Sequence, residues 1–127
     1  MSEMVNVRYM VDDVQQAVDW YAGNFGFSVQ MNAAPAFASV EKGALRLLLS
    51  GKTSSAGRPM PDGAQPVAGG WNRFQVIVED IGAEYDRLKA NGVKFRNEVL
   101  KGPGGSQVLA QDPAGNVVEL FQPAARA

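Results

Sequence analysis

Two hydrophobic patterns alternate along the first fifty residues of the chain. Short apolar-rich segments predict strands at 5–11, 27–31, 37–41 and 44–50; apolar and polar residues alternate at 27–31, and the last two segments flank the turn Lys42-Gly43 as a hairpin. An apolar stripe at helical spacing predicts one helix, and its members are Val14, Ala17, Val18, Tyr21 and Phe25. Asp12 and Asp13 occupy the N-cap position of this helix, and Gly26 ends it. The predicted order is therefore β-α-β-β-β.

The same order recurs after residue 70. Glu79 and Asp80 stand at a second N-cap position, and the stripe of Ile81, Tyr85 and Leu88 follows. Asn91 and Gly92 end this helix. The strands predicted around it are 74–78, 93–100, 106–111 and 117–122, with turns at 102–105 and 112–116.

The two halves match residue by residue. Val11-Asp12-Asp13-Val14 aligns with Val78-Glu79-Asp80-Ile81 at an offset of 67 residues (80 − 13). Asp19 meets Asp86 at the same offset, and Asn24 meets Asn91. A fixed period with matching helix caps indicates a duplicated unit. We expect one domain over residues 1–127, with module one at about 4–50, module two at about 71–122, and residues 51–70 as a Gly-, Pro- and Ser-rich loop or linker.

Composition narrows the chemistry. The chain of 127 residues contains no Cys and no His, which excludes disulfides, thiol nucleophiles, Ser–His triads and imidazole-bound metals. The formal charge of -1 gives no electrostatic footprint for nucleic acid or an anionic membrane. No apolar run reaches the length of a membrane helix, and the N-terminus lacks the pattern of a signal peptide. We therefore expect a cytoplasmic protein with no nucleic-acid or membrane partner.

The chain resembles the vicinal oxygen chelate superfamily, also called the glyoxalase/bleomycin resistance protein/dioxygenase group. The residues that carry this resemblance are VRYMVDDVQQAVDWYAGNFGF, VIVEDIGAEYDRLKANGV and, most specifically, QDPAGNVVELFQP. The resemblance implies an α+β fold of tandem βαβββ modules that form a cup-shaped, partly open β-barrel around a small ligand. It also implies a homodimer.

Catalytic members of that superfamily hold a divalent metal through four side chains, two from each module. Counting back seven residues from Asp13 and Asp80 places two of these positions at Asn6 and Arg73. Counting four residues on from Gly43 and Gly115 places the others at Leu47 and Glu119. Only Glu119 suits a hard cation, and a guanidinium repels one. We therefore expect neither a metal nor another cofactor.

Strand alternation adds detail to these positions. Val117, Glu119 and Phe121 fall on one face of their strand, so Glu119 is expected to line the cup. We predict that Arg73 and Glu119 form an ion pair within about 4 Å, while a role in ligand binding and a general-base role remain open for Glu119. Trp71 lies two residues before Arg73 and should share its face. The expected ligand-binding set is Asn6, Phe37, Leu47, Met60 from the loop, Trp71, Arg73 and Glu119.

These features favour non-catalytic binding or sequestration of a small organic molecule, as in the antibiotic-sequestering branch of the superfamily. One alternative is a metal-independent lyase, isomerase or epimerase that uses Glu119 for proton transfer. A second is a divalent-metal-dependent lyase or dioxygenase like the catalytic members. A third is a structural or regulatory protein whose cup is filled by its own side chains. An enzyme requires Glu119 to be free of Arg73, which the structure can test.

Overall fold

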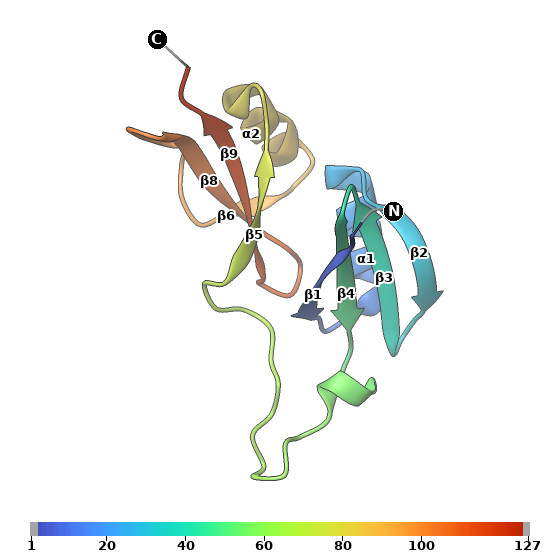
Figure 1. Ribbon diagram of the computed structural model, residues 1–127. Helices are drawn as coiled ribbons and strands as arrows, with labels where there is room; N and C mark the ends of the chain where they lie inside the picture. The colour runs from blue at the N-terminus through green and yellow to red at the C-terminus, as the bar shows by residue number, and fades with distance from the viewer. Residues whose placement is uncertain (1–2, 126–127) are drawn as a thin grey trace. The chain divides into compact units, whose positions relative to one another are not determined.

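The computed structural model describes residues 3–125, which gather into two compact units. The first unit contains residues 3–69 together with 113–116, and the second contains 70–112 together with 117–125. Each unit consists of one mixed sheet with one α-helix against it (Figure 1). The α+β class is confirmed, and so is the expected β-α-β-β-β order of the first unit.

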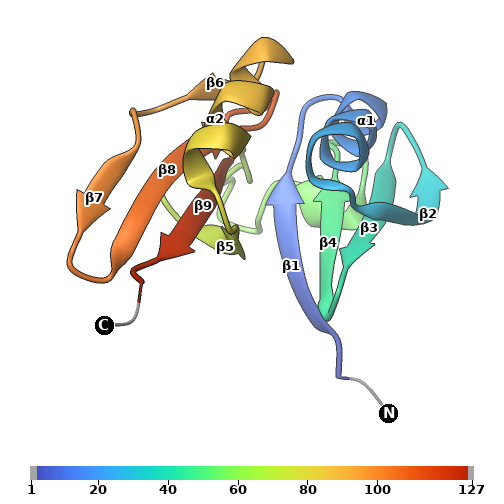
Figure 2. The same ribbon diagram turned by 90° about the horizontal axis from the view of Figure 1, so that it is seen from above.

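The first unit carries a four-stranded sheet in the order β1-β4-β3-β2, with β1 and β4 parallel and the other pairs antiparallel. Helix α1 covers one face of this sheet (Figure 2). The elements are β1 (Val5–Met10), α1 (Val14–Phe25), β2 (Ser28–Ala33), β3 (Phe37–Lys42), β4 (Leu45–Ser50) and the short 3-10 helix η1 (Ser55–Gly57).

Helix α1 begins and ends where the sequence predicts. The Asp13 carboxylate accepts a hydrogen bond of 3.0 Å from the Gln16 backbone N–H, which satisfies a donor of the first turn. Gly26 ends the helix in the left-handed conformation, with φ of 70°, which glycine adopts without strain. Tyr21 and Leu49 are fully buried in the core between helix and sheet. Burying a side chain of this size contributes roughly 1.5–3 kcal/mol.

The second unit repeats this plan. Its sheet has the order β5-β9-β8-β6, with β7 also paired to β8, and β5 and β9 are parallel. Helix α2 packs on β8 and β9 (Figure 2). The elements are β5 (Arg73–Ile77), α2 (Ile81–Ala90), β6 (Lys94–Phe95), β7 (Leu100–Gly102), β8 (Gly105–Gln111) and β9 (Val117–Pro123). The Asp80 carboxylate caps α2 by accepting from the Ala83 N–H at 3.0 Å, as Asp13 does 67 residues earlier.

The single strand predicted at 93–100 is wrong. Only Lys94–Phe95 and Leu100–Gly102 pair with β8 as strands. Between them, the side-chain oxygen of Asn97 accepts a hydrogen bond of 2.9 Å from the Leu109 backbone N–H. An Asn side chain thus takes the place of a backbone acceptor, which is how this residue type interrupts a ladder. Residues 96–99 therefore do not continue the single strand that the apolar content of 93–100 predicts.

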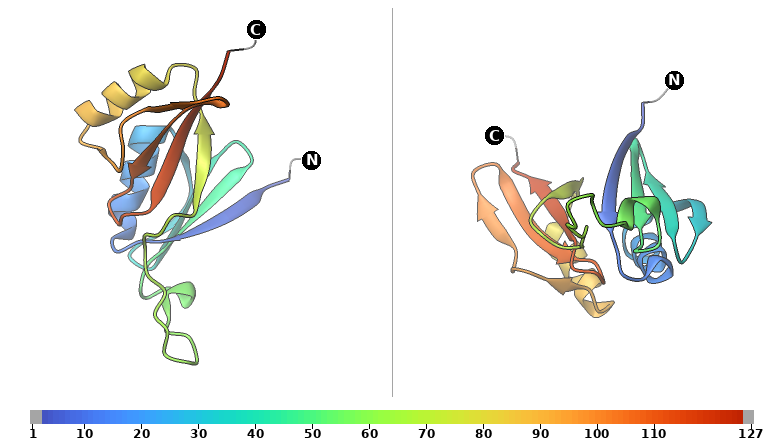
Figure 3. Two further views of the ribbon diagram at one scale, coloured as in Figure 1. Left: turned by 90° about the vertical axis from the view of Figure 1, so that its left-hand side faces the viewer. Right: turned by 90° about the horizontal axis from the view of Figure 1, so that it is seen from below.

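The loop after β4 packs against the first unit. Ser54 is buried, accepts from the Gly57 N–H and donates to the Gly51 carbonyl, which forms η1. Farther along, the buried Asn116 side chain accepts from the Gly69 N–H at 2.9 Å and donates to the Met10 carbonyl at 2.8 Å. Hydrogen bonds therefore hold both ends of the loop within this unit. Figure 3 shows the course of the loop backbone.

In residues 3–125 the strands pair into two separate sheets rather than into one closed barrel. That the sheets enclose a cup, and that both modules act as one domain, stay predictions. Neither α-helix in this part of the chain is long and apolar enough to cross a membrane.

Candidate functional site

The candidate site lies on the face of the second sheet opposite α2, which we call the open face of the second sheet. Val118 and Leu120 of β9 are fully buried on the helix side, so Glu119 between them points to the other side. In the parallel register, Glu119 is paired with Gln75 of β5. Arg73 lies two residues before Gln75 and therefore on the same face.

Both carboxylate oxygens of Glu119 are engaged. Arg73 Nε donates to Oε1 at 2.9 Å, and Gln75 Nε2 donates to Oε2 at 2.7 Å. The side chains of Arg73 and Glu119 are 28% and 13% exposed, so this ion pair is partly shielded from water. The pairing of Arg73 with Glu119, which the sequence predicts, is confirmed. Glu119 is therefore an anchored hydrogen-bond acceptor and not a free carboxylate.

The arginine also connects this network to Trp71. Arg73 Nη1 donates to the Trp71 carbonyl at 3.0 Å. The guanidinium of Arg96 lies 4.3 Å from the centre of the Trp71 ring, in the geometry of a cation–π contact. Trp71 is nevertheless 68% exposed. Two arginines therefore position Trp71, and most of its surface remains exposed to solvent.

Three rows of side chains cross the open face of the second sheet. Ladder partners share a face, so each row follows from the strand register. The first row is apolar except for one amide, the second contains the Glu119 network, and the third begins with Arg73. Their members are Ile77, Phe121, Gln107 and Leu100; then Gln75, Glu119 and Leu109; then Arg73, Val117 and Gln111. Val117 and Leu109 of this face are buried. Its accessible part therefore combines the apolar side chains of the first row with a few oriented polar groups.

The remaining expected ligand-binding residues belong to the first unit. Asn6 is exposed on β1 and shares a face with Arg46, on the side of the first sheet away from α1. Phe37 is half-buried on β3 and pairs with Ser50. It therefore lies on the same face as Arg46, beside the last residue of β4. Met60 is 47% exposed within the loop. Their roles in binding stay predictions.

The assignment of Leu47 to this set is wrong. Leu47 is 0% exposed and lies in the core beneath α1. Arg8, the counterpart of Gln75 at the offset of 67, pairs with Leu48, whereas Gln75 pairs with Glu119. Leu48 is therefore the counterpart of Glu119. Counting from the turn glycines misses this shift of one residue, which moves a side chain to the opposite face.

Sequence reasoning also missed Gln75 and Arg96. Gln75 lies two residues after Arg73 on the same strand, and this alternation could have revealed it. Arg96 reaches Trp71 from the interrupted segment between β6 and β7, where the sequence predicts a continuous strand. No sequence signal marks that contact.

The family model of the Glyoxalase/Bleomycin resistance protein/Dioxygenase superfamily matches residues 4–120. The chain belongs to this superfamily.

Solved structures of similar fold include proteins of different activity. A superfamily member from Sphaerobacter thermophilus is 24% identical over 96% of this chain and 98% of that chain, with a TM-score of 0.76. TnmS3, an antibiotic binding protein from Streptomyces sp. CB03234, is 25% identical over 98% of both chains, with a TM-score of 0.70. A lactoylglutathione lyase from Agrobacterium tumefaciens is 22% identical over 96% of this chain and 94% of that chain, with a TM-score of 0.72. No curated protein matches the sequence significantly.

The residues at the superfamily's metal-ligand positions do not fit a divalent metal. Glu119 already accepts from two donors, and one of these is the guanidinium of Arg73. Leu47 and its neighbour Leu48 have no donor atom, so Asn6 provides the one other oxygen. In the described part of the chain, no three His, Cys, Asp or Glu side chains cluster. Hard cations require several oxygen ligands, and this set provides too few.

Proposed function

We propose that this superfamily member binds a small organic molecule on the open face of the second sheet and does not transform it. The observation that carries this proposal is the engagement of both Glu119 oxygens by Arg73 and Gln75. A general base must be within hydrogen-bond reach of the proton that it removes. An anchored carboxylate held between two donors is instead suited to orient a ligand's hydroxyl or amide donor.

The composition of this face supports the proposal. Small-molecule sites are mostly apolar and aromatic, with a few placed polar groups. Trp71 provides a large, rigid apolar ring, and the exposed Ile77 and Leu100 extend the apolar area across the sheet. Glu119 and Gln75 provide the polar groups in the middle of the face. We propose Trp71, Arg73 and Glu119 as the principal contacts.

The relatives support binding over catalysis. TnmS3, at 25% identity, is described as an antibiotic binding protein. The lactoylglutathione lyase, at 22% sequence identity, shares only the fold with this chain. A metal-independent lyase, isomerase or epimerase needs a free Glu119, and the contact of 2.9 Å with Arg73 opposes that role. The residues present do not provide the ligand set that a metal-dependent lyase or dioxygenase needs.

We also propose that the chain forms a homodimer. Strand β2 is an edge of the first sheet and is exposed along its whole length, with Val29 49% and Met31 46% exposed. An edge strand with apolar side chains and unpaired backbone groups invites pairing with another chain. A second copy of this chain supplies such a partner without any other protein.

Tryptophan fluorescence tests the binding proposal. The chain has two tryptophans, so Trp20→Phe leaves Trp71 as the single reporter. This variant is titrated with a panel of aromatic and peptide antibiotics that includes metal-free bleomycin. We expect at least one compound to change the emission saturably. Arg73→Ala should weaken that binding, whereas Arg87→Ala on α2 should not. A panel that leaves the Trp71 emission unchanged throughout, or equal binding by Arg73→Ala, would contradict the proposal.

A further inference from the structure

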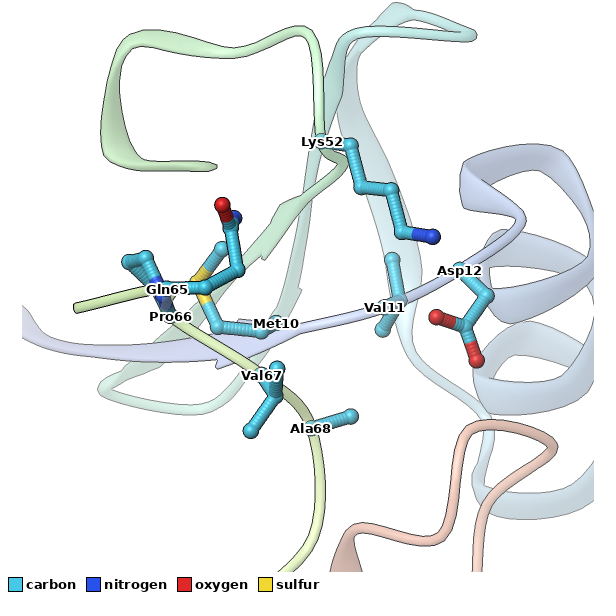
Figure 4. Close-up of a pocket in the computed structure, with 8 residues that line it drawn as sticks. All are labelled: Met10, Val11, Asp12, Lys52, Gln65, Pro66, Val67 and Ala68. Atoms are coloured by element: carbon cyan, nitrogen blue, oxygen red, sulfur yellow. The ribbon is translucent and has the colours of Figure 1, made fainter. Parts of the chain in front are cut away.

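A pocket of about 190 Å³ lies within the first unit, and none of the residues that line it carries the proposed function. It opens to solvent and is lined by the end of β1, by Lys52 at the start of the loop after β4 and by the last part of that loop (Figure 4). Apolar groups form one part of its lining, and these are Met10, Val11, Pro66, Val67 and Ala68. The polar side chains that complete it are Asp12, Lys52 and Gln65.

The walls of this pocket are fixed by hydrogen bonds. The Val11 N–H donates to the Ser50 carbonyl at 3.0 Å, which holds the end of β1. Gln65 Nε2 donates to the Gly57 carbonyl at 2.9 Å, which anchors one end of the loop wall. Asn116 bridges the Met10 carbonyl and the Gly69 N–H at the other end. The hollow is therefore formed by the fold and is not a gap beside a free loop.

Opposite charges face this pocket without meeting. The Lys52 side chain extends toward Asp12 along one side, while Met10 and Pro66 lie at the other end (Figure 4). In residues 3–125, the ion pairs within 4 Å join other residues, and neither Asp12 nor Lys52 forms a side-chain hydrogen bond. Each charge is consequently available to a ligand group of the opposite sign.

We propose that this pocket binds a zwitterionic molecule of the α-amino-acid class with an apolar side chain. The ligand's ammonium group pairs with Asp12, its carboxylate pairs with Lys52, and its side chain lies against Met10 and Val67. Charge-assisted hydrogen bonds of this kind are about twice as strong as neutral ones. The volume is below the roughly 300–1,000 Å³ of sites for drug-sized ligands, which suits a molecule of amino-acid size.

Isothermal titration calorimetry with L-leucine tests this proposal on the intact chain. We expect saturable binding by the wild type and a dissociation constant raised about tenfold or more by Lys52→Gln and by Asp12→Asn, since each removes one charged partner. The matched controls are Lys101→Gln and Asp86→Asn, which make the same charge changes at exposed positions of the second unit. These controls should bind L-leucine like the wild type.

Two analogues probe the same pairing without changing the protein. Isocaproate lacks the ammonium group and isoamylamine lacks the carboxylate, so each should bind the wild type about tenfold more weakly than L-leucine, or worse. Wild-type protein that is folded by circular dichroism and gives no saturable heat with L-leucine would overturn the proposal. Equal binding of either analogue would also overturn it. Because the pocket and the Trp71 site use different residues, either result leaves the proposed function standing.

Discussion

Replacing Arg73 by alanine tests whether this residue acts as the charge partner of Glu119. The substitution leaves Glu119, whose side chain is 13% exposed, with one remaining donor, Gln75. Breaking a fully buried ion pair costs about 3–5 kcal/mol, and an exposed pair contributes about 0–1 kcal/mol. Because this pair is partly shielded and Gln75 still donates, we expect Arg73→Ala to lower the free energy of unfolding by about 1–3 kcal/mol.

A double variant tests whether Arg73 and Glu119 stabilise the fold through their contact with each other. Arg73→Met combined with Glu119→Leu removes both charges and restores apolar volume, so it should cost less than either single substitution. Arg87→Ala provides the matched control, since its partner Glu84 forms a pair of 2.6 Å on α2 with side chains 43% and 37% exposed. That control should change stability by no more than about 0.5 kcal/mol.

Urea denaturation followed by circular dichroism measures these differences, with the slope of each transition compared across the variants. Two results would refute the reasoning. One is an Arg73→Ala effect no larger than that of Arg87→Ala. The other is a double variant whose loss equals the sum of the two single losses, because additivity means that the two side chains do not interact.

Three further predictions concern the loop, the metal and the assembly. Asn116→Ala removes the bonds to the Met10 carbonyl and the Gly69 N–H and should lower the free energy of unfolding by about 1–3 kcal/mol in urea; an unchanged midpoint would contradict this. Elemental analysis of protein purified without a His-tag should find no stoichiometric divalent metal, whereas about one ion per chain, removable by a chelator, would overturn the ligand analysis. Light scattering at micromolar concentration should return twice the chain mass of 13.6 kDa, and the mass of a single chain would contradict the dimer.

Local rules predicted most of each unit. The acidic caps at Asp13 and Asp80 and the apolar stripe that follows each of them determine the helices, because both signals depend on neighbouring residues alone. The Arg73–Glu119 pair was also predictable. The spacing from Asp80 and from Gly115 identifies them as two positions that the superfamily resemblance brings together, and strand alternation turns both side chains to the same face.

Features that depend on distant residues could not be predicted in this way. The break between β6 and β7 depends on Asn97 reaching the backbone of β8, which lies 12 residues away along the chain. The error at Leu47 comes from assuming equal registers after Gly43 and Gly115, whereas the register of β1 with β4 differs by one residue. The pocket of the first unit depends on Asn116, which comes from the end of the second module.

The central claim is that a small organic molecule binds beside Trp71 and leaves the protein unchanged. Native mass spectrometry over a long incubation tests it directly, using a compound that the fluorescence panel selects. We expect a complex whose released ligand keeps its original mass and its retention time on a chiral column at every time point. We also expect Trp71→Ala to lose the complex while remaining folded. A ligand mass or chiral retention time that changes during incubation with the wild type but not with Glu119→Gln would contradict the claim and identify Glu119 as catalytic.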